Sequence, residues 1–319
     1  MKRVMVTGAS GFVGSALCAH LARAQYRVIG VVRRVSDPIP SVTYIEADLT
    51  HHQALSQKFP AVDCLIHLAG RAHVLVEHVK DPLAAFREVN RDATLRLAQR
   101  ALDAGVKRFV FISSIGVNGN RTLSEPFREG SPVNPQAPYA VSKWETEVRL
   151  KALLEGTAME LVIVRPPLIY SEASPGNFGS FLKLIRTGVP LPFGNVTNKR
   201  SLISRLNVVE FLQVCVHHPD AAGELFLVSD GQDVSTPEMV KIISQGMRKS
   251  TNLFSLPLPW LEFALSRMGK ASMYRQLCGS LQVDASKAKD LLGWVPTGTT
   301  PAGLEEVGRK FRYFRRRRG

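Results

Sequence analysis

The stretch near the start of the chain that indicates its fold is Lys2-Arg-Val-Met-Val-Thr-Gly8-Ala-Ser-Gly11-Phe-Val-Gly14. An apolar run precedes glycines spaced three residues apart, and Ser15–Arg23 follows as a predicted helix. Gly8 permits a tight turn, Gly11 lets the backbone approach a pyrophosphate, and Gly14 lets the helix pack on the strand. Because free N–H groups at a helix N-terminus attract anions, this GxxGxxG turn predicts a dinucleotide site. The alternative is an ordinary strand-to-helix turn without a ligand.

Further segments read as strands, and helical segments separate them. The predicted strands are Val28–Val32, Val42–Leu49, Cys64–Gly70, Arg108–Ile112 and Leu161–Tyr170. Residues 81–104 and 139–154 have apolar side chains at three-to-four spacing, which predicts helices. Alternation of strands and helices predicts an α/β fold with a doubly wound parallel sheet of the Rossmann type. Its strands end at one edge, where ligands bind.

The composition is that of a globular protein. The chain has 319 residues, of which 45% are hydrophobic. No apolar run reaches the roughly 18 residues that span a bilayer. The first predicted strand begins near residue 3, which leaves no room for a signal peptide, so we expect a cytoplasmic protein. The cysteines (Cys18, Cys64, Cys215 and Cys278) share no metal-like spacing, which indicates free thiols and no metal site.

The chain is strongly basic, with a formal net charge of +14. Much of the charge lies in Arg309-Lys-Phe-Arg-Tyr-Phe-Arg-Arg-Arg-Arg318, which we interpret as a solvated tail. A weak contact of this tail with a membrane surface is the alternative. No nucleic-acid-binding motif is recognisable, so we expect no nucleic-acid partner. The remaining charge suits an anionic small substrate.

The residues after the second strand bear on the choice of cofactor. A carboxylate at this point binds the ribose of NAD, whereas an arginine suits the 2′-phosphate of NADP. Val32 stands where that carboxylate is expected, and Arg33 and Arg34 follow. The sequence therefore favours NADP(H), with NAD(H) as the alternative. Asp48 is a candidate partner of the adenine amino group, or else the cap of a helix near Thr50.

The fourth predicted strand ends in small residues. Ala69 and Gly70 leave room for a nicotinamide ribose to pass close to the backbone. His67 lies inside the apolar run, so we interpret it as a hydrogen-bonded core residue rather than a ligand.

Tyr139 and Lys143 lie four residues apart on one face of a predicted helix. A phenol with a pKa near 10 transfers protons poorly at neutral pH, and a nearby ammonium lowers that pKa. Ser114 follows the fifth predicted strand at the ligand edge, where its hydroxyl can orient a substrate oxygen. These residue types predict proton transfer to or from a substrate oxygen.

These features together resemble the extended short-chain dehydrogenase/reductase family, also called the NAD-dependent epimerase/dehydratase family. The resemblance runs from Arg3 to about Leu304. It rests on VTGASGFVG, Asp48-Leu49, HLAG, Val89-Asn90, SSIGVNG, Tyr139-Ala-Val-Ser-Lys143, VRPPLIY, Asn177-Phe178, Lys199-Arg200-Ser201 and Val283-Asp284-Ala-Ser-Lys287.

The resemblance implies an enzyme in which Ser114, Tyr139 and Lys143 are catalytic, with Lys143 also holding the nicotinamide ribose. It implies a homodimer formed through helices near 91–104 and 139–154. The implied cofactor-binding residues are Gly8, Ser10, Gly11, Phe12, Val13, Arg33, Arg34, Asp48, Leu49, Leu68, Ala69, Gly70, Asn90, Tyr139, Lys143 and Pro166.

The resemblance also implies a nucleotide-diphosphate sugar as substrate. Arg200 and Arg275 look like the family's two diphosphate-binding arginines, because a planar bidentate donor suits phosphate. Either could instead be an ordinary surface arginine. Ser114 would contact the sugar, and Asn177 and Phe178 would frame the nucleotide.

Departures from the family pattern narrow the implied reaction. The 4,6-dehydratases carry Asp-Glu after the hydroxyl residue, where this chain has Ile115-Gly116. Asn118 replaces a usual tyrosine, and Leu168 stands where some epimerases have asparagine. The chain looks most similar to UDP-N-acetylquinovosamine-type 4-ketoreductases, which implies NADPH-dependent reduction of a 4-keto, 6-deoxy (amino)sugar for surface polysaccharide (O-antigen) synthesis.

Other functions are compatible with the same residues. An NAD-dependent 4-epimerase acting on a UDP-hexose or UDP-N-acetylhexosamine uses the same catalytic residues. A hydroxysteroid-type dehydrogenase has no need of two diphosphate-binding arginines. A cofactor-sensing regulator on the same fold is the non-enzyme alternative, although the retained Tyr139 and Lys143 argue against it.

The expected domain organisation is interleaved. Residues 1–167, with about 201–228, would form the dinucleotide-binding domain. Residues 168–200 and 229–308 would form a smaller substrate-binding lobe, followed by the basic tail at 309–319.

Overall fold

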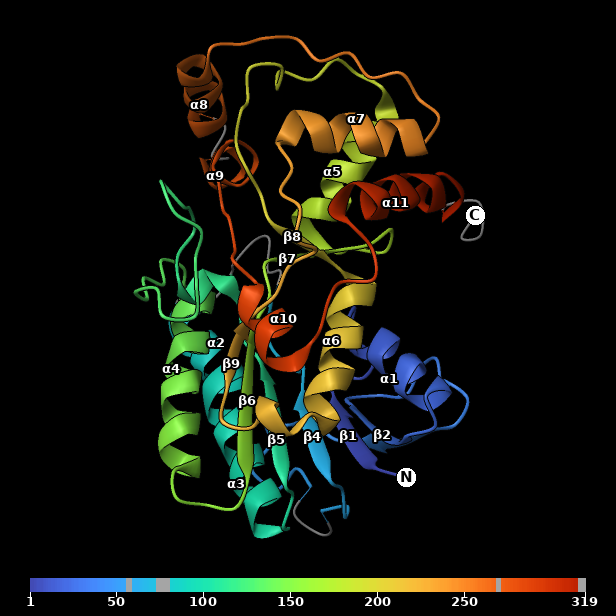
Figure 1. The fold of residues 1–319 in the computed structure, drawn as a ribbon, viewed down its shortest axis with the longest axis vertical. Coiled ribbons are helices and arrows are strands. Elements are labelled where there is room, and N and C mark those ends of the chain that lie inside the picture. Colours follow the sequence, from blue (N-terminus) through green and yellow to red (C-terminus); the bar gives the residue numbers. More distant parts are fainter. Residues whose placement is uncertain (56–58, 73–80, 268–270, 315–319) are drawn as a thin grey trace.

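The computed structural model describes residues 1–55, 59–72, 81–267 and 271–314. Within them, parallel strands form a seven-stranded sheet in the order β3-β2-β1-β4-β5-β6-β9 (Figure 1). The strands are β1 (Arg3–Thr7), β2 (Arg27–Val32), β3 (Val42–Glu46), β4 (Cys64–His67), β5 (Arg108–Ile112), β6 (Glu160–Arg165) and β9 (Leu225–Leu227). The strand order reverses between β1 and β4, which is the switch point where such sheets bind ligands. The predicted doubly wound α/β fold is confirmed.

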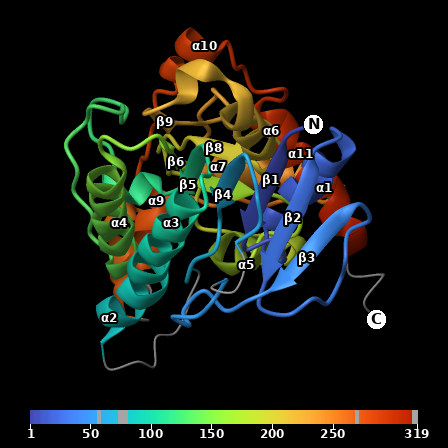
Figure 2. The ribbon, with the colours of Figure 1, turned by 90° about the horizontal axis from the view of Figure 1, so that it is seen from below.

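Helices cover both faces of the sheet (Figures 1 and 2). The helices on one face are α1 (Gly14–Arg23), α6 (Arg205–His217) and α10 (Ser286–Leu292), and those on the other are α3 (Ala93–Asp103) and α4 (Pro138–Leu154). Along β1, Val4 and Val6 pack into the first apolar layer and Met5 packs into the second. Because both faces are covered, the strand is apolar at successive positions instead of alternating with polar residues.

The strand predicted from Leu161 to Tyr170 is two strands. β6 ends at Arg165, and β7 (Leu168–Tyr170) leaves the main sheet to pair with β8 (Leu202–Ser204). Pro166 and Pro167 cause the break, because neither has an N–H group to donate to a neighbouring strand. The break directs the chain from the sheet into the second lobe.

The helix predicted at residues 81–104 is also interrupted. It consists of α2 (Pro82–Phe86), a π-helical segment η1 (Arg87–Asp92) and α3. At the end of η1 the Ala93 N–H donates to the carbonyl of Glu88, five residues earlier. Such a turn holds an extra residue, and π-helical turns are frequent at functional sites.

The second lobe has an apolar core of its own. Its main helices are α5 (Gly176–Thr187), α7 (Thr236–Gly246) and α11 (Thr300–Phe314), with α8 (Leu258–Arg267) and α9 (Ala271–Cys278) to one side (Figure 1). α11 continues through the first residues of the predicted solvated tail, and Phe311 is buried in this core. Residues 315–319 of that tail lie outside the described residues. No helix in the described ranges is long and apolar enough to cross a membrane.

A buried ion pair joins α4 to β6. The Arg165 guanidinium donates to both carboxylate oxygens of Glu147, and its Nη1 donates to Asn118 Oδ1 at 2.9 Å. The Arg165 and Glu147 side chains are 3% and 0% exposed. The pair fixes the helix of Tyr139 and Lys143 against the sheet.

Replacing Glu147 by Leu should destabilise the protein. It leaves the Arg165 charge buried without a counter-charge, so we expect the free energy of unfolding to fall by about 3–5 kcal/mol in urea titrations. Replacing both partners by apolar residues should cost less than the single change. The exposed pair of Arg128 with Asp284 supplies a control, because Arg128→Ala should cost less than about 1 kcal/mol. If both variants lost the same free energy of unfolding, the buried ion pair would not be a special support of α4.

Candidate active site

The glycine turn lies at the edge where β1 and β4 end. Gly8 has a φ of +67°, and a Cβ there would lie 2.8 Å from the Ala69 nitrogen. A Cβ on Gly14 would collide with the Gly8 carbonyl oxygen. The turn therefore requires glycine at both positions for conformation and close approach. α1 begins at Gly14, and the open backbone before it forms a cradle that fits a dinucleotide pyrophosphate.

The Lys143 amine lies at the end of β5. Its Nζ donates to the Ile112 carbonyl at 2.7 Å and lies 4.5 Å from the centre of the Phe111 ring. The same Nζ is 6.0 Å from the centre of the Tyr139 ring. An ammonium has three N–H donors, so the bond to Ile112 leaves donors for ribose hydroxyls.

Ser114 begins the short helix η2 (Ile115–Val117), and its Oγ accepts from the Gly116 N–H at 3.1 Å. Gly116 separates Ser114 from α4, because a Cβ there would lie 3.3 Å from both Ser114 Oγ and Ala140 Cβ. The structure therefore brings Ser114 to the first turn of α4, near Tyr139. Pro166 also supports this loop, since its carbonyl accepts from the Ile115 N–H at 3.0 Å.

Burial shifts both titratable groups towards their neutral forms. Loss of water lowers the pKa of Lys143 to about 8, and the Glu147 carboxylate acts weakly in the opposite direction. Burial raises the pKa of Tyr139 to about 12. This differs from the expectation that Lys143 lowers the phenol pKa. The reason is desolvation, which disfavours the phenolate and also weakens the positive charge of the amine beside it.

His67 is a buried hydrogen-bonded residue, as interpreted from the sequence. Its Nδ1 lies 2.7 Å from the Thr7 hydroxyl and its Nε2 lies 2.8 Å from the Thr94 hydroxyl. The Thr94 hydroxyl donates to the Asn90 carbonyl, so it accepts from a protonated Nε2. Burial, with a smaller effect of Lys143, lowers the pKa of His67 to about 3, so the ring is neutral.

Asn90 lies in η1 and connects the cofactor edge to α4. Its Oδ1 accepts from the Arg71 N–H at 2.7 Å, and its Nδ2 donates to Ser142 Oγ at 3.1 Å. The Ser142 hydroxyl donates to the Tyr139 carbonyl at 2.7 Å. Asn90 was predicted from the sequence and Ser142 was not, although Ser142 lies between Tyr139 and Lys143 on the same helix.

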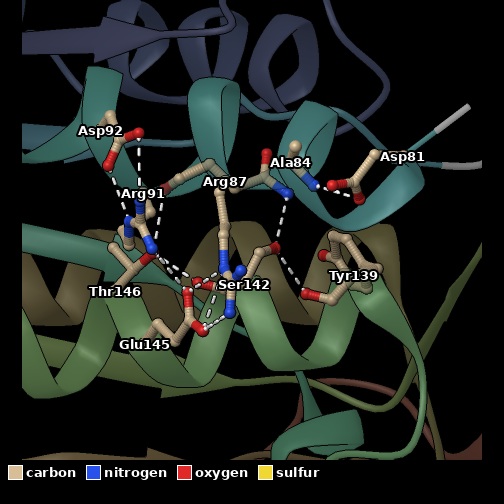
Figure 3. Close-up of polar contacts among 10 residues, drawn as sticks. Asp81, Ala84, Arg87, Arg91, Asp92, Tyr139, Ser142, Glu145 and Thr146 are labelled. Carbon is tan, nitrogen blue, oxygen red and sulfur yellow. Dashed lines mark hydrogen bonds and ion pairs between the residues drawn. The ribbon is translucent and has the colours of Figure 1, made fainter. Parts of the chain in front are cut away.

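Ion pairs on the outer side of the same two segments hold them together (Figure 3). Arg87 donates to both carboxylate oxygens of Glu145, and Arg91 Nη1 donates to Glu145 Oε2 at 3.0 Å. Asp81 caps the first turn of α2 by accepting from the Ala84 N–H. The helix α4 is therefore held to η1 by two kinds of interaction. Neutral hydrogen bonds act near Asn90, and ion pairs with Glu145 act on the outer side.

The predicted adenosine end of the site is exposed. Arg33 and Arg34 project into solvent after β2, whereas Val32 is buried. Asp48 accepts from the backbone and hydroxyl of Thr50, and these bonds hold the pKa of Asp48 below its usual range. Residues 49–55 form turns and not a helix, so Asp48 closes a turn with Thr50 instead of capping a helix.

The other predicted cofactor residues lie along this edge. Phe12 belongs to the glycine turn, and the Arg205 guanidinium lies 5.1 Å from its ring centre. Arg205 was not predictable from the sequence, because it lies far along the chain from the ring that it stacks on. The remaining predicted residues in the turn and at neighbouring strand ends are half-buried or exposed: Ser10, Gly11, Val13, Leu49, Leu68, Ala69 and Gly70.

Of the predicted substrate residues, Arg200 is buried, whereas Arg275 and Asn177 are exposed. Arg200 is 9% exposed, and its Nη1 donates to the Gly279 carbonyl at 3.0 Å. Among the described residues no carboxylate pairs with it, and burial lowers its pKa to about 10. Arg275 lies exposed on α9. The exposed Asn177 donates to Gln276 Oε1 at 2.6 Å, which joins α5 to α9.

Phe178 is not exposed to a ligand groove. Its ring is 5% exposed and packs with Tyr170 and Phe181 in the core of the second lobe. The prediction that its ring frames a nucleotide therefore does not fit this burial.

Replacing Lys143 by Met should change how stability depends on pH. The pKa of the amine falls from 10.5 to about 8 on folding, so the unfolded chain holds more protons between these pH values. Raising the pH through this window therefore favours folding. We expect the free energy of unfolding of the unaltered protein, relative to Lys143→Met, to rise by about 3 kcal/mol from pH 8 to pH 10.5.

Urea titrations at several pH values measure this difference. Tyr139 is present in both proteins, so its own titration cancels. Lys151→Met, at an exposed position of the same helix, is the matched control and should give a flat difference. A flat difference for Lys143→Met as well would show that the amine is not desolvated.

Comparisons with known proteins show relatives of this chain and a solved structure with the same fold. A UDP-glucose 4-epimerase of Vibrio cholerae is 39% identical over 315 residues, covering 97% of this chain and 95% of that protein. An N-acetyl-α-D-glucosaminyl-diphospho-ditrans,octacis-undecaprenol 4-epimerase of Escherichia coli O157:H7 is 29% identical, with 95% and 93% covered. A crystal structure of UDP-glucose 4-epimerase with UDP-glucose from Thermotoga maritima has a TM-score of 0.78 at 21% identity, covering 99% of this chain and 100% of that one.

The sequence model of the NAD dependent epimerase/dehydratase family matches residues 4–229, which include the glycine turn, Ser114, Tyr139 and Lys143. The chain therefore belongs to the NAD-dependent epimerase/dehydratase family and is an enzyme of the short-chain dehydrogenase/reductase type.

Proposed function

We propose that this enzyme reduces the 4-keto group of a nucleotide-linked 6-deoxy (amino)sugar with NADPH, in a cytoplasmic step of surface polysaccharide synthesis. The observation that supports an anionic sugar nucleotide is the burial of Arg200 without a carboxylate partner among the described residues. A buried guanidinium needs a counter-charge, and a diphosphate supplies one in bidentate geometry. Arg275, exposed on α9, is the second proposed contact.

Ser114, Tyr139 and Lys143 divide the proton chemistry among them. A nicotinamide bound beside Gly70 would supply the hydride that reduces the carbonyl carbon. The Ser114 hydroxyl donates to the substrate oxygen and orients it, while the Tyr139 phenol delivers the proton that this oxygen needs. Lys143 donates to the ribose and, when charged, favours loss of the phenol proton.

Reduction uses Tyr139 in its protonated form, because the substrate oxygen must gain a proton. Burial raises the pKa of Tyr139 to about 12, so the side chain carries its proton at neutral pH. A 4-epimerase uses the same phenol to remove a proton from the sugar hydroxyl and to return it, so net consumption of cofactor separates the two reactions and the protonation of this side chain does not.

The surroundings of the second strand support NADPH. Val32 is buried and its side chain offers no acceptor to a ribose hydroxyl, and Arg33 and Arg34 are exposed where they can meet a 2′-phosphate. The nearby Glu46 carboxylate accepts from the Val35 N–H at 2.8 Å. The family also includes NAD users, such as a UDP-glucuronic acid 4-epimerase of Bacillus cereus solved in complex with NAD.

A 4-epimerase is the second candidate, because the Vibrio cholerae relative at 39% identity is named a UDP-glucose 4-epimerase. Such an enzyme would interconvert sugars without net consumption of cofactor. In either case we propose a homodimer that uses the outer sides of α3 and α4.

The decisive measurement offers the purified enzyme a UDP-linked 4-keto-6-deoxy-N-acetylhexosamine and NADPH. We expect stoichiometric NADPH oxidation and a 4-hydroxy sugar by mass spectrometry. Tyr139→Phe should lower kcat by about a hundredfold or more while cofactor affinity falls far less, because the proton donor is lost and the Lys143 contact with the ribose is kept. Failure to oxidise NADPH, together with interconversion of UDP-sugars on added NAD, would establish the epimerase instead.

Cofactor preference has its own test. Arg33→Ala should weaken NADPH binding by about tenfold and leave NADH binding unchanged, because only NADPH has the 2′-phosphate. Fluorescence titration of the nicotinamide measures both affinities. Arg27→Ala, at the opposite end of β2, is the control. Equal loss for both cofactors would place Arg33 away from the 2′ position.

A further inference from the structure

The second lobe ends in an edge of exposed aromatic side chains. Trp260 and Phe263 of α8 are 69% and 63% exposed, and Phe254 in the preceding connection is 44% exposed. Trp260 and Phe263 are three residues apart and so share one face of the helix. Figure 1 shows α8 and the α7–α8 connection at the end of the molecule farthest from the sheet. We call Phe254, Trp260 and Phe263 the aromatic edge.

This exposure is unfavourable in water. Aromatic side chains bury large apolar areas when they find a partner, and contiguous exposed patches mark interaction sites. Tryptophan in particular is enriched where proteins meet the headgroup layer of membranes, because its ring is apolar and its N–H is polar.

The chain segment that carries the aromatic edge is basic overall, although Glu262 lies between Trp260 and Phe263 on α8. The Arg267 guanidinium lies 5.8 Å from the centre of the Phe263 ring, at the exposed end of α8. Residues 239–280 contain a single acidic side chain, Glu262. The basic residues of that segment are Lys241, Arg248, Lys249, Arg267, Lys270 and Arg275. Aromatic side chains beside cations complement an anionic lipid surface and disfavour a second basic copy of this chain.

The position of the aromatic edge leaves it accessible in the assembly proposed above. The homodimer would use α3 and α4, which flank the sheet, whereas α8 lies on the second lobe (Figure 1). Since no described helix can cross a membrane, the contact would be peripheral.

We propose that the aromatic edge docks this enzyme on a bilayer containing anionic phospholipid, with Trp260 and Phe263 inserted at the headgroup level. α8 packs on α9, which bears Arg275, so docking holds the substrate lobe against the membrane surface. Docking requires no sugar nucleotide and is measured without one, so its failure and failure of the proposed reduction are distinguishable.

Vesicle binding tests the proposal with the full chain. Sedimentation should show binding to vesicles of phosphatidylcholine mixed with phosphatidylglycerol and much weaker binding to phosphatidylcholine alone. Replacing Trp260 and Phe263 together by Ser should lower the partition coefficient by about tenfold or more, because two buried aromatic contacts are lost. Leu123→Ser, at an 82% exposed position elsewhere, is the matched control and should bind normally.

Fluorescence locates the contact. Of the three tryptophans, Trp294 is buried and Trp144 is half-buried, so a blue shift on adding vesicles should come from Trp260. Trp260→Phe should keep binding and lose the shift.

Three results would overturn the proposal. The first is undiminished binding by the Trp260/Phe263 double variant. The second is loss of binding on truncation after Phe314 while the double variant still binds, which would assign the contact to the basic tail. The third is a change of oligomeric state in the double variant, seen by sedimentation velocity, which would assign the aromatic edge to a second copy.

Discussion

A buried amine is the constraint on which the construction of this site depends. Lys143 lies at the end of β5 with little access to water, and burial lowers its pKa to about 8. The amine is tolerated because the Ile112 carbonyl accepts from it and Glu147 lies one helical turn away. Glu147 is itself buried and depends on Arg165 of β6. The contacts that stabilise the amine therefore join α4 to β5 through Ile112 and to β6 through Arg165.

The other hydrogen bonds that hold the site in place come from uncharged side chains. His67 has a pKa of about 3 and therefore links Thr7 of β1 to Thr94 of α3 without adding a charge near Lys143. Asn90 continues this network to Ser142 and the backbone of Tyr139. A polar network whose members all have partners is rigid, whereas an additional cation here would repel the amine. Rigidity and low charge are both needed where a single proton is transferred.

The sequence was sufficient for features that depend on local rules. The spacing of glycines predicted the turn after β1, and the backbone does require glycine at Gly8 and Gly14. Alternation of strands and helices predicted the parallel sheet. Four-residue spacing placed Tyr139 and Lys143 on one turn of α4. Features that depend on burial were not predictable: the raised pKa of Tyr139 arises from desolvation by residues distant in sequence. The core position of Phe178 and the break at Pro166 are tertiary outcomes of the same kind.

The π-helical segment η1 carries polar side chains that join the cofactor edge to the helix of Tyr139. A π turn accommodates one residue more than an α turn, so deleting one residue from 87–92 would restore regular α-helical bonding there. The flanking helices α2 and α3 would keep their faces, because the wider turn had absorbed the extra residue. Within the segment the residues on one side of the deletion would move up by one position, so the Asn90 bond to Ser142 or the Arg87 pair with Glu145 would be lost. The irregular turn therefore confines the effect of one extra residue to these contacts and leaves the packing of the flanking helices intact.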